Sequence, residues 1–230
     1  MTELLNISIL PLAVTLVAYQ IGLICQKKTR SAFCNPILIA VILVLGFLFL
    51  SGMELETYQT GAGFIGWLMT PVTVCLAIPM YQQVQVMKNN WKAIIAGVAC
   101  GALSCMLMVL AFCVVMGLDR SLTITLLPKS VTTAIAAPLS QMAGGMSAVT
   151  TAVVICTGIL ANVLSPVLIR LFRLTDEIAA GVALGTAGHA IGTSRANELS
   201  PLTGAISSLS LVIAGLLTSV VFPVITAFLV

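Results

Sequence analysis

Charged residues are scarce in this chain, and their scarcity excludes an ordinary water-soluble protein. Only 7% of the 230 residues are charged, against about 25% in a typical soluble domain. Hydrophobic residues make up 60% of the sequence, and the mean hydropathy is +1.16. The formal charge of +3 is spread over short loops without a basic stripe, so nucleic acid is not an expected partner. The composition predicts one all-α integral membrane domain, residues 1–230, that crosses the lipid bilayer several times.

The sequence also lacks the residue patterns of metal centres, disulfide frameworks and common enzyme sites. Its seven cysteines form no Cys-x-x-Cys pair, and nearly all lie inside apolar runs, as small packing residues do. The expected spans carry no Asp or Glu at mid-membrane, and His189 is the single histidine. No Asp/Asp, Ser/His or metal-ligand constellation is present. We therefore expect no metal, no cofactor and no enzymatic activity.

Apolar segments predict about seven to eight membrane segments in two repeats. In the first half, segments are expected at residues 5–25, 36–50, 64–81 and 93–118. In the second half, they are expected at residues 122–143, 148–171, 178–196 and 202–230. One member of each half is interrupted by proline or glycine, so the halves (about 1–118 and 119–230) resemble two copies of one plan. Transporters built from inverted repeats have interrupted segments at corresponding positions.

The orientation follows from the positive charges, which favour cytoplasmic loops. Lys27, Lys28 and Arg30 follow the first span and Glu3 precedes it, so the N-terminus is predicted outside the cytoplasm.

Two arrangements remain open for residues 122–143, which are broken at Pro128. If this segment crosses the membrane, Arg170 and Arg173 fall outside, against the positive-inside tendency. If it re-enters, these arginines return to the cytoplasm. We favour a segment that does not cross as a simple helix.

Lys129 is a candidate ligand-binding residue, because it lies in the middle of this segment. A lysine at membrane depth is costly unless it faces a cavity or a partner. Ser130 and Thr132 would add hydroxyl groups to a cationic site for an anion. The alternative is a lysine that extends along apolar surface to the membrane interface.

Residues 185–196 read Gly-Thr-Ala-Gly-His-Ala-Ile-Gly-Thr-Ser-Arg-Ala. His189 titrates near neutral pH, which suits proton coupling or a hydrogen bond to substrate; the alternative is a histidine bonded inside a helix bundle. The Arg195 guanidinium suits a carboxylate; the alternative is an ion pair with Glu198, three positions on. Two further candidates for the site are the hydroxyl residues Thr193 and Ser194.

Prolines and glycines mark the expected breaks in the helices around this site. The expected break positions are Pro71, Pro128, Gly185, Gly188 and Gly192. The glycine spacing also suits a small-residue face for close helix packing, and the two roles can coexist. Thr70 and Thr73 flank Pro71 and would direct their hydroxyl groups toward the same midplane site. Because the interrupted segments are cationic, the predicted ligand is an anion.

Three stretches resemble the signature motifs of the LrgB/CidB family, which includes YohK-type inner-membrane proteins of bacteria. They are Leu-Pro-Lys-Ser-Val-Thr-Thr at 127–133, the stretch at 185–196, and Thr-Pro-Val-Thr-Val-Cys-Leu-Ala-Ile-Pro-Met-Tyr at 70–81. In the last stretch, Thr70 stands for the usual glycine and Cys75 for the usual alanine. The resemblance covers essentially the whole chain and implies a bacterial inner-membrane protein.

The resemblance implies two functions, and the sequence leaves both open. Bacterial members are described as antiholin-like modulators of murein hydrolase export and autolysis, paired with a small LrgA/CidA-type membrane protein. Plastid relatives that fuse both parts translocate glycolate and glycerate, and bacterial members have been linked to pyruvate. We favour a transporter of such monocarboxylates, because a cationic site between interrupted helices suits a small anion. Membrane lipid and further copies of the chain, in a homo-oligomer, are the other expected partners.

Overall fold

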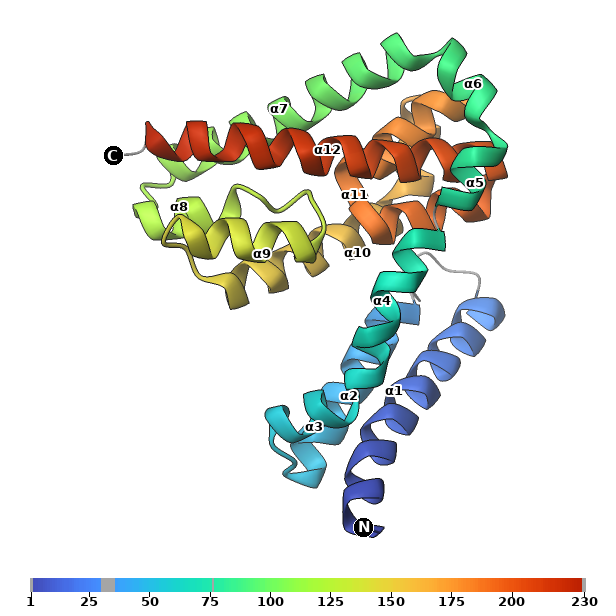
Figure 1. Ribbon diagram of the computed structural model, residues 1–230, viewed down its shortest axis with the longest axis vertical. Coiled ribbons are helices and arrows are strands. Elements are labelled where there is room, and N and C mark those ends of the chain that lie inside the picture. The colour runs from blue at the N-terminus through green and yellow to red at the C-terminus, as the bar shows by residue number, and fades with distance from the viewer. Residues whose placement is uncertain (1, 30–35, 76, 229–230) are drawn as a thin grey trace. The chain divides into compact units, whose positions relative to one another are not determined.

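A computed structural model describes residues 2–29, 36–75 and 77–228, in which all the regular elements are α-helices (Figure 1). They are α1 (Thr2–Thr29), α2 (Pro36–Ser51), α3 (Leu55–Gly61), α4 (Gly63–Cys75), α5 (Ala77–Gln82), α6 (Val84–Asn89), α7 (Trp91–Val115), α8 (Arg120–Leu126), α9 (Thr133–Met142), α10 (Ser147–Leu171), α11 (Glu177–Leu199) and α12 (Pro201–Ala227). They form two compact units, Met1–Cys75 and Leu76–Val230. The predicted all-helical fold is confirmed.

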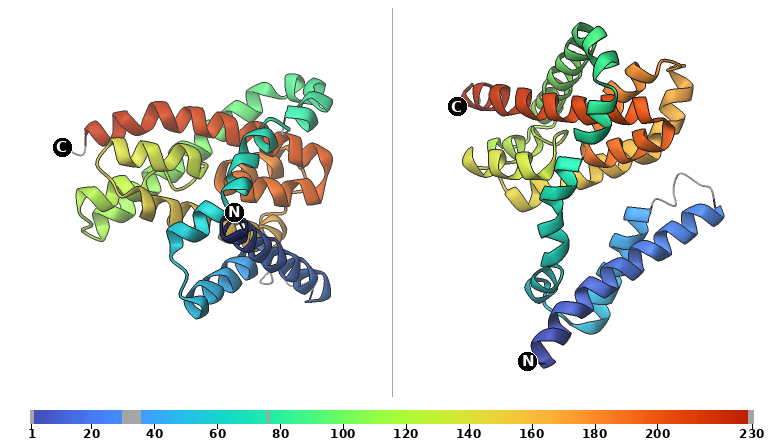
Figure 2. Two further views of the ribbon diagram at one scale, coloured as in Figure 1. Left: turned by 60° about the horizontal axis from the view of Figure 1, so that its bottom comes forward. Right: turned by 45° about the vertical axis from the view of Figure 1, so that its right-hand side comes forward.

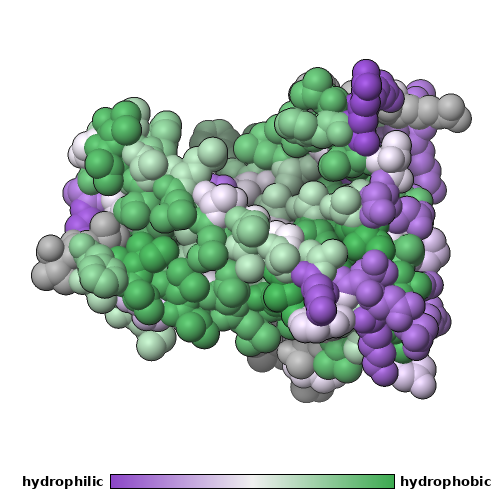
Figure 3. Space-filling model, turned by 90° about the horizontal axis from the view of Figure 1, so that it is seen from above, coloured by the Kyte–Doolittle hydropathy of each residue, from purple (hydrophilic) through white to green (hydrophobic). Residues whose placement is uncertain are grey.

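The surface of the molecule is that of a membrane protein. Four stretches within the described helices are long and apolar enough to cross a bilayer: Ile9–Thr29, Trp91–Val115, Ser147–Leu171 and Pro201–Ala227. Hydrophobic side chains cover most of the face shown in Figure 3, and hydrophilic ones gather along one edge. Exposed apolar surface of this extent suits lipid contact. The described residues do not confirm the expected total of seven to eight segments.

In the first unit, α1 packs against α2 and α3. Gly22 lets α2 approach closely, because a Cβ atom there would lie 2.6 Å from the Pro36 carbonyl oxygen. The Thr15 and Tyr58 hydroxyl groups form a hydrogen bond that joins α1 to α3. The break expected at Pro71 does not occur at that residue, since α4 continues through it to the end of the unit.

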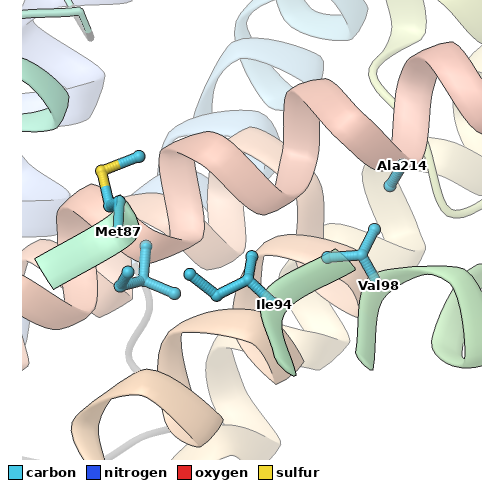
Figure 4. Close-up of a cluster of buried hydrophobic side chains, with 5 residues drawn as sticks. Met87, Ile94, Val98 and Ala214 are labelled. Carbon is cyan, nitrogen blue, oxygen red and sulfur yellow. The ribbon is translucent and has the colours of Figure 1, made fainter. Parts of the chain in front are cut away.

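The core of the second unit forms where α6, α7, α11 and α12 meet. Its buried side chains are Met87, Ile94, Val98, Ile206 and Ala214, four of which are labelled in Figure 4. Ile94 and Val98 are fully buried on one face of α7, and Ile206 and Ala214 are buried on α12. This cluster holds α7 and α12 together and supports α6 and α11, which pack at the same place.

The segment expected at residues 122–143 folds back on itself. With seven residues, α8 is about 10 Å long, a third of the roughly 30 Å hydrocarbon core of a bilayer. The chain turns at residues 127–132 and returns through α9. The Ser121 hydroxyl then donates to the Gly144 carbonyl oxygen (3.4 Å), so both ends of the segment lie together. We call α8, this turn and α9 the first hairpin; it corresponds to the re-entrant alternative.

The helix α11 also doubles back, at His189. With φ 41° and ψ −134°, this residue divides α11 into halves of residues 177–188 and 190–199. A Cβ atom at Gly192 would overlap the Leu184 carbonyl oxygen, although a straight helix would separate these residues by about 12 Å. The halves therefore lie against each other, and we call them the second hairpin. The interruption predicted in this segment falls at the histidine.

The second hairpin packs against α10 and α12 (Figure 2), and glycines allow the close approach. A Cβ atom at Gly181 would lie 2.8 Å from the Thr203 carbonyl oxygen of α12, and one at Gly188 would lie 2.9 Å from Ala161 Cβ of α10. The predicted small-residue face of α11 thus exists, and it coexists with the break in the same helix.

The two hairpins enter the second unit from opposite ends. The base of the first hairpin lies at the start of α10, whereas Gly97, near the start of α7, faces Val182 in the second hairpin. Both α7 and α10 have 25 residues, and each is followed by a 23-residue hairpin. Residues 91–142 and 147–199 thus each consist of a 25-residue helix followed by a hairpin. This pairing differs from the repeats expected on either side of residue 118, which the described residues do not confirm.

A threonine at the base of the first hairpin provides a test of its packing. The buried Thr150 hydroxyl lies 3.0 Å from the Thr125 carbonyl oxygen and 2.7 Å from Ser140 Oγ. Thr150→Val is expected to lower the free energy of unfolding by about 1–3 kcal/mol, because these buried partners lose a hydrogen bond. Thermal denaturation in detergent measures the change. Thr151→Val is the neighbouring control, and equal losses in both variants would contradict the prediction.

Candidate functional site

Lys129 lies at the tip of the first hairpin. Pro128 has no N–H to extend α8, and Thr132 starts α9 with an extended backbone (φ −62°, ψ 147°). Lys129 Nζ lies 3.6 Å from Cys105 Sγ on α7 and 3.4 Å from Ser130 Oγ. Neither group is a carboxylate. Among the described residues, the side-chain ion pair joins Arg195 and Glu198 and does not involve Lys129. The half-buried ammonium therefore has no carboxylate to balance its charge.

A cavity of about 490 Å³ opens beside this ammonium. Its walls come from the first hairpin tip, from α7, from one face of α10, and from the first half of α11. The polar lining consists of Lys129, Ser130, Thr157, Ser165 and Cys105. The remaining lining is aliphatic, so Lys129 supplies the positive charge of the cavity. A pocket of this kind, mostly apolar with a few convergent polar groups, is the usual form of a small-ligand site.

A second cavity, of about 630 Å³, lies between α7 and the first half of α11. Asn90 and Asp176 line one end of it, and Cys105 and Thr186 line the part near the hairpin tips. Cys105 and two alanines of α11 belong to the walls of both cavities. The two cavities thus adjoin beside Lys129.

His189 lies at the tip of the second hairpin and is 4% exposed. Its Nε2 lies 3.0 Å from the carbonyl oxygen of Val154 in α10. Because a carbonyl only accepts, Nε2 carries the proton in this bond. Gly158 makes room for the ring, since a Cβ atom there would lie 2.5 Å from His189 Cε1. The two hairpin tips line a common cavity, through Lys129 and Ser130 of the first hairpin and Ala187 of the second.

Two of the other predicted residues make bonds inside the second hairpin. The Thr193 hydroxyl donates to the His189 carbonyl oxygen (2.8 Å) and lies 2.9 Å from Ser207 Oγ of α12, so it fastens the hairpin. Arg195 pairs with Glu198, three positions on, which is the surface ion pair of the alternative interpretation. Ser194 is exposed, and these cavities do not include it or Arg195 in their walls.

The remaining predicted residues fall into three groups. Thr132 is half-buried at the start of α9 and is not among the residues that line the two cavities. Gly185, Gly188 and Gly192 lie in the second hairpin at close contacts with α12, α10 and Leu184. The side chains of Thr70 and Thr73 lie outside the described residues. Of the predicted residues, the structure therefore brings Lys129 and Ser130 together at the cavity, whereas His189 lies at the tip of the second hairpin outside the cavity walls.

Sequence reasoning missed Cys105 and Thr186, which line the cavities beside Lys129. The cysteine reads as a packing residue in an apolar run, and nothing local marks its contact with a lysine 24 positions away. Thr186 lies inside the glycine-rich stretch, but its neighbours there carry stronger chemical signals. Within the described part of the chain, no three His, Cys, Asp or Glu side chains are grouped to hold a metal ion.

His189→Ala is expected to lower the free energy of unfolding by about 1–3 kcal/mol. The substitution removes a buried hydrogen bond and the ring that fills the space beside Gly158. It also leaves alanine in a backbone conformation that side chains rarely adopt. Thermal denaturation in detergent is the measurement, with the exposed Ser194→Ala as control. A melting temperature equal to that of the control would contradict the conclusion that the ring stabilises the packing of the second hairpin on α10.

Comparison with known proteins agrees with the motifs. The LrgB-like family matches residues 15–228 of the chain. The chain is also 33% identical, over 219 residues, to a protein of Bacillus cereus (strain B4264) named antiholin-like protein LrgB, and the match covers 95% of both chains. No solved structure matches the chain. The resemblance drawn from the sequence motifs is confirmed.

Proposed function

Because this chain belongs to the LrgB-like family, we propose that it is a membrane transporter whose substrate site lies between the two hairpin tips. The substrates are small monocarboxylates such as glycolate, glycerate or pyruvate. One observation carries this proposal: the Lys129 ammonium faces a cavity of about 490 Å³ without an acidic partner in the described residues.

The electrostatics of the site favour an anion. A buried charge without a counter-ion is unfavourable in a membrane, and such residues mark ligand and ion pathways. A carboxylate would accept hydrogen bonds from Lys129 Nζ and would balance its charge. The apolar walls would exclude water and strengthen this interaction. The His189 Nε2–H donates to the Val154 carbonyl oxygen, so the ring holds the tip of the second hairpin in place.

The arrangement of the membrane segments supports transport. Tips of oppositely directed hairpins that meet at mid-depth resemble the broken-helix sites of secondary transporters. The proposed eight segments count each hairpin as one, together with the four long helices and the shorter α2 and α4. Lys92, Arg170 and Arg173 lie at the end where the second hairpin enters, so we propose that this end is cytoplasmic. The chain would then lie in the bacterial inner membrane with its N-terminus outside and no enzymatic activity.

The second candidate function is an antiholin-like modulator of murein hydrolase export and autolysis, acting with a small LrgA/CidA-type membrane partner. The name of the similar Bacillus cereus protein favours it. This name supports the antiholin-like function more directly than it supports transport of a carboxylate. The two functions differ in selectivity, because a transporter accepts a defined anion whereas a lesion releases unrelated solutes.

Uptake into proteoliposomes that contain only this chain tests the proposal. Radiolabelled glycolate and pyruvate are supplied with and without a pH gradient, and a trapped fluorescent dye reports leakage. Saturable uptake without dye release is expected. Uptake that requires an added LrgA-type partner would make the chain one part of a two-part transporter. Dye release without saturable uptake would contradict transport and support the antiholin-like candidate.

A further inference from the structure

The Thr186 hydroxyl group is buried without a hydrogen-bond partner. The residue is 6% exposed, and its Oγ1 is the buried side-chain oxygen that stays unpaired among the described residues. Buried hydroxyl groups nearly always have a partner, because losing water without replacing it is unfavourable. An unpaired hydroxyl next to a cavity therefore points to a ligand.

Thr186 also departs from the behaviour of similar residues in its unit. Several hydroxyl side chains in helices there bond back to the carbonyl oxygen four positions earlier, as Thr193, Ser208, Ser210, Ser219 and Thr226 do. That bond is the ordinary way for a helical threonine to satisfy its hydroxyl group. Thr186 does not make it, so its hydroxyl group is left without a partner among the described residues.

The position of Thr186 relates this hydroxyl group to the Lys129 site. Its methyl group lies against α7, since a Cβ atom at Gly101 would lie 3.0 Å from Thr186 Cγ2. The residue lines the 630 Å³ cavity together with Cys105, and Cys105 is in contact with Lys129. It also lines a narrow gap at the first hairpin tip beside Ser130. Thr186 thus lines space that adjoins the first hairpin tip.

We propose that Thr186 is a substrate-binding residue that recognises an oxygen atom next to the carboxylate held by Lys129. Its hydroxyl group donates to a keto oxygen, or donates to or accepts from a hydroxyl group, on the carbon beside the carboxylate. A carboxylate without this oxygen leaves Thr186 unpaired and binds more weakly. This inference rests on the proposed function, because it takes the Lys129 site as the place of the anion.

Binding to the purified chain in detergent tests the inference without relying on transport. Lactate and propionate are compared, since they differ by one hydroxyl group, and calorimetry measures their affinities. We expect the chain to prefer lactate by roughly tenfold, the usual effect of one neutral hydrogen bond. Thr186→Val, which keeps the shape of the side chain, is expected to abolish this preference and leave propionate affinity unchanged. Thr186→Ser, which keeps the hydroxyl group, is expected to retain it.

Two results would overturn the inference. One is a folded Thr186→Val variant with the lactate preference of the original chain, and the other is an original chain that binds the two anions equally or not at all. Melting temperatures identify the folded variants. Thr186→Ser supports the assignment of Thr186 as a substrate-binding residue only if this variant still prefers lactate to propionate. Selective binding without any uptake into proteoliposomes would refute the proposed transport and leave the assignment of Thr186 standing.

Discussion

Replacing Lys129 by methionine is expected to lower uptake of glycolate or pyruvate by about a hundredfold, while the chain still inserts and folds. Methionine has a similar length without charge, so it removes the interaction with the carboxylate and keeps the packing. Removing one member of a buried ion pair costs about 3 kcal/mol or more, which corresponds to this factor. Because Lys129 has no acidic partner in the described residues, its loss leaves no carboxylate of the protein unpaired.

Initial rates of radiolabelled uptake into proteoliposomes measure this effect. Lys92→Met is the matched control, because Lys92 is exposed at the start of α7, where it lies over the ring of Trp91. It is expected to retain uptake. Lys129→Arg keeps the charge on a wider group, and we expect partial uptake. Undiminished uptake in folded Lys129→Met would remove the ammonium from the substrate site.

Gly192→Val is expected to lower the free energy of unfolding by about 3 kcal/mol and to abolish uptake. A Cβ atom at this position would overlap the Leu184 carbonyl oxygen in the other half of the second hairpin. That neighbour is backbone, so relief requires the two halves to separate, which is an overpacking effect at the upper end of its usual range. The hairpin tip that carries His189 would move with them.

Thermal denaturation and uptake together test this prediction. Gly46→Ala is the control, because no atom lies within 4 Å of the Cβ position at this glycine of α2. A helical Gly→Ala change with space for the methyl group is expected to stabilise the chain by up to about 1 kcal/mol. If Gly192→Val melts at the temperature of the original chain, the close packing of the two α11 halves is wrong.

Composition and apolar runs predicted the class of the protein well. Charged residues are so few that a membrane environment follows, and spans expected at 93–118, 148–171 and 202–230 correspond to α7, α10 and α12. These elements were predictable because each depends on a continuous run of residues. The re-entrant form of residues 122–143 was one of two alternatives, and the Ser121–Gly144 hydrogen bond agrees with it.

What could not be predicted depends on contacts between distant residues. The entry of the two hairpins from opposite ends of the second unit is a relation in space, with little trace in residue types. Glycines marked a break in α11 without fixing its position, because the backbone reverses at the non-glycine residue His189. Likewise, the contact of Cys105 with Lys129 follows from side-chain geometry that local patterns do not carry. The pairing of Arg195 with Glu198, three positions on, was one of the two alternatives that the sequence left open.

The meeting of the two hairpin tips near the middle of α7 and α10 has an electrical consequence. If one hairpin enters from each side of the membrane, as proposed, a monoanion bound at Lys129 would have crossed about half of the membrane voltage. A full elementary charge changes its energy by about 2.3 kcal/mol per 100 mV, so half of the voltage corresponds to about 1.2 kcal/mol. We therefore expect substrate affinity to change roughly sevenfold per 100 mV, and a site at either membrane surface would show no such dependence.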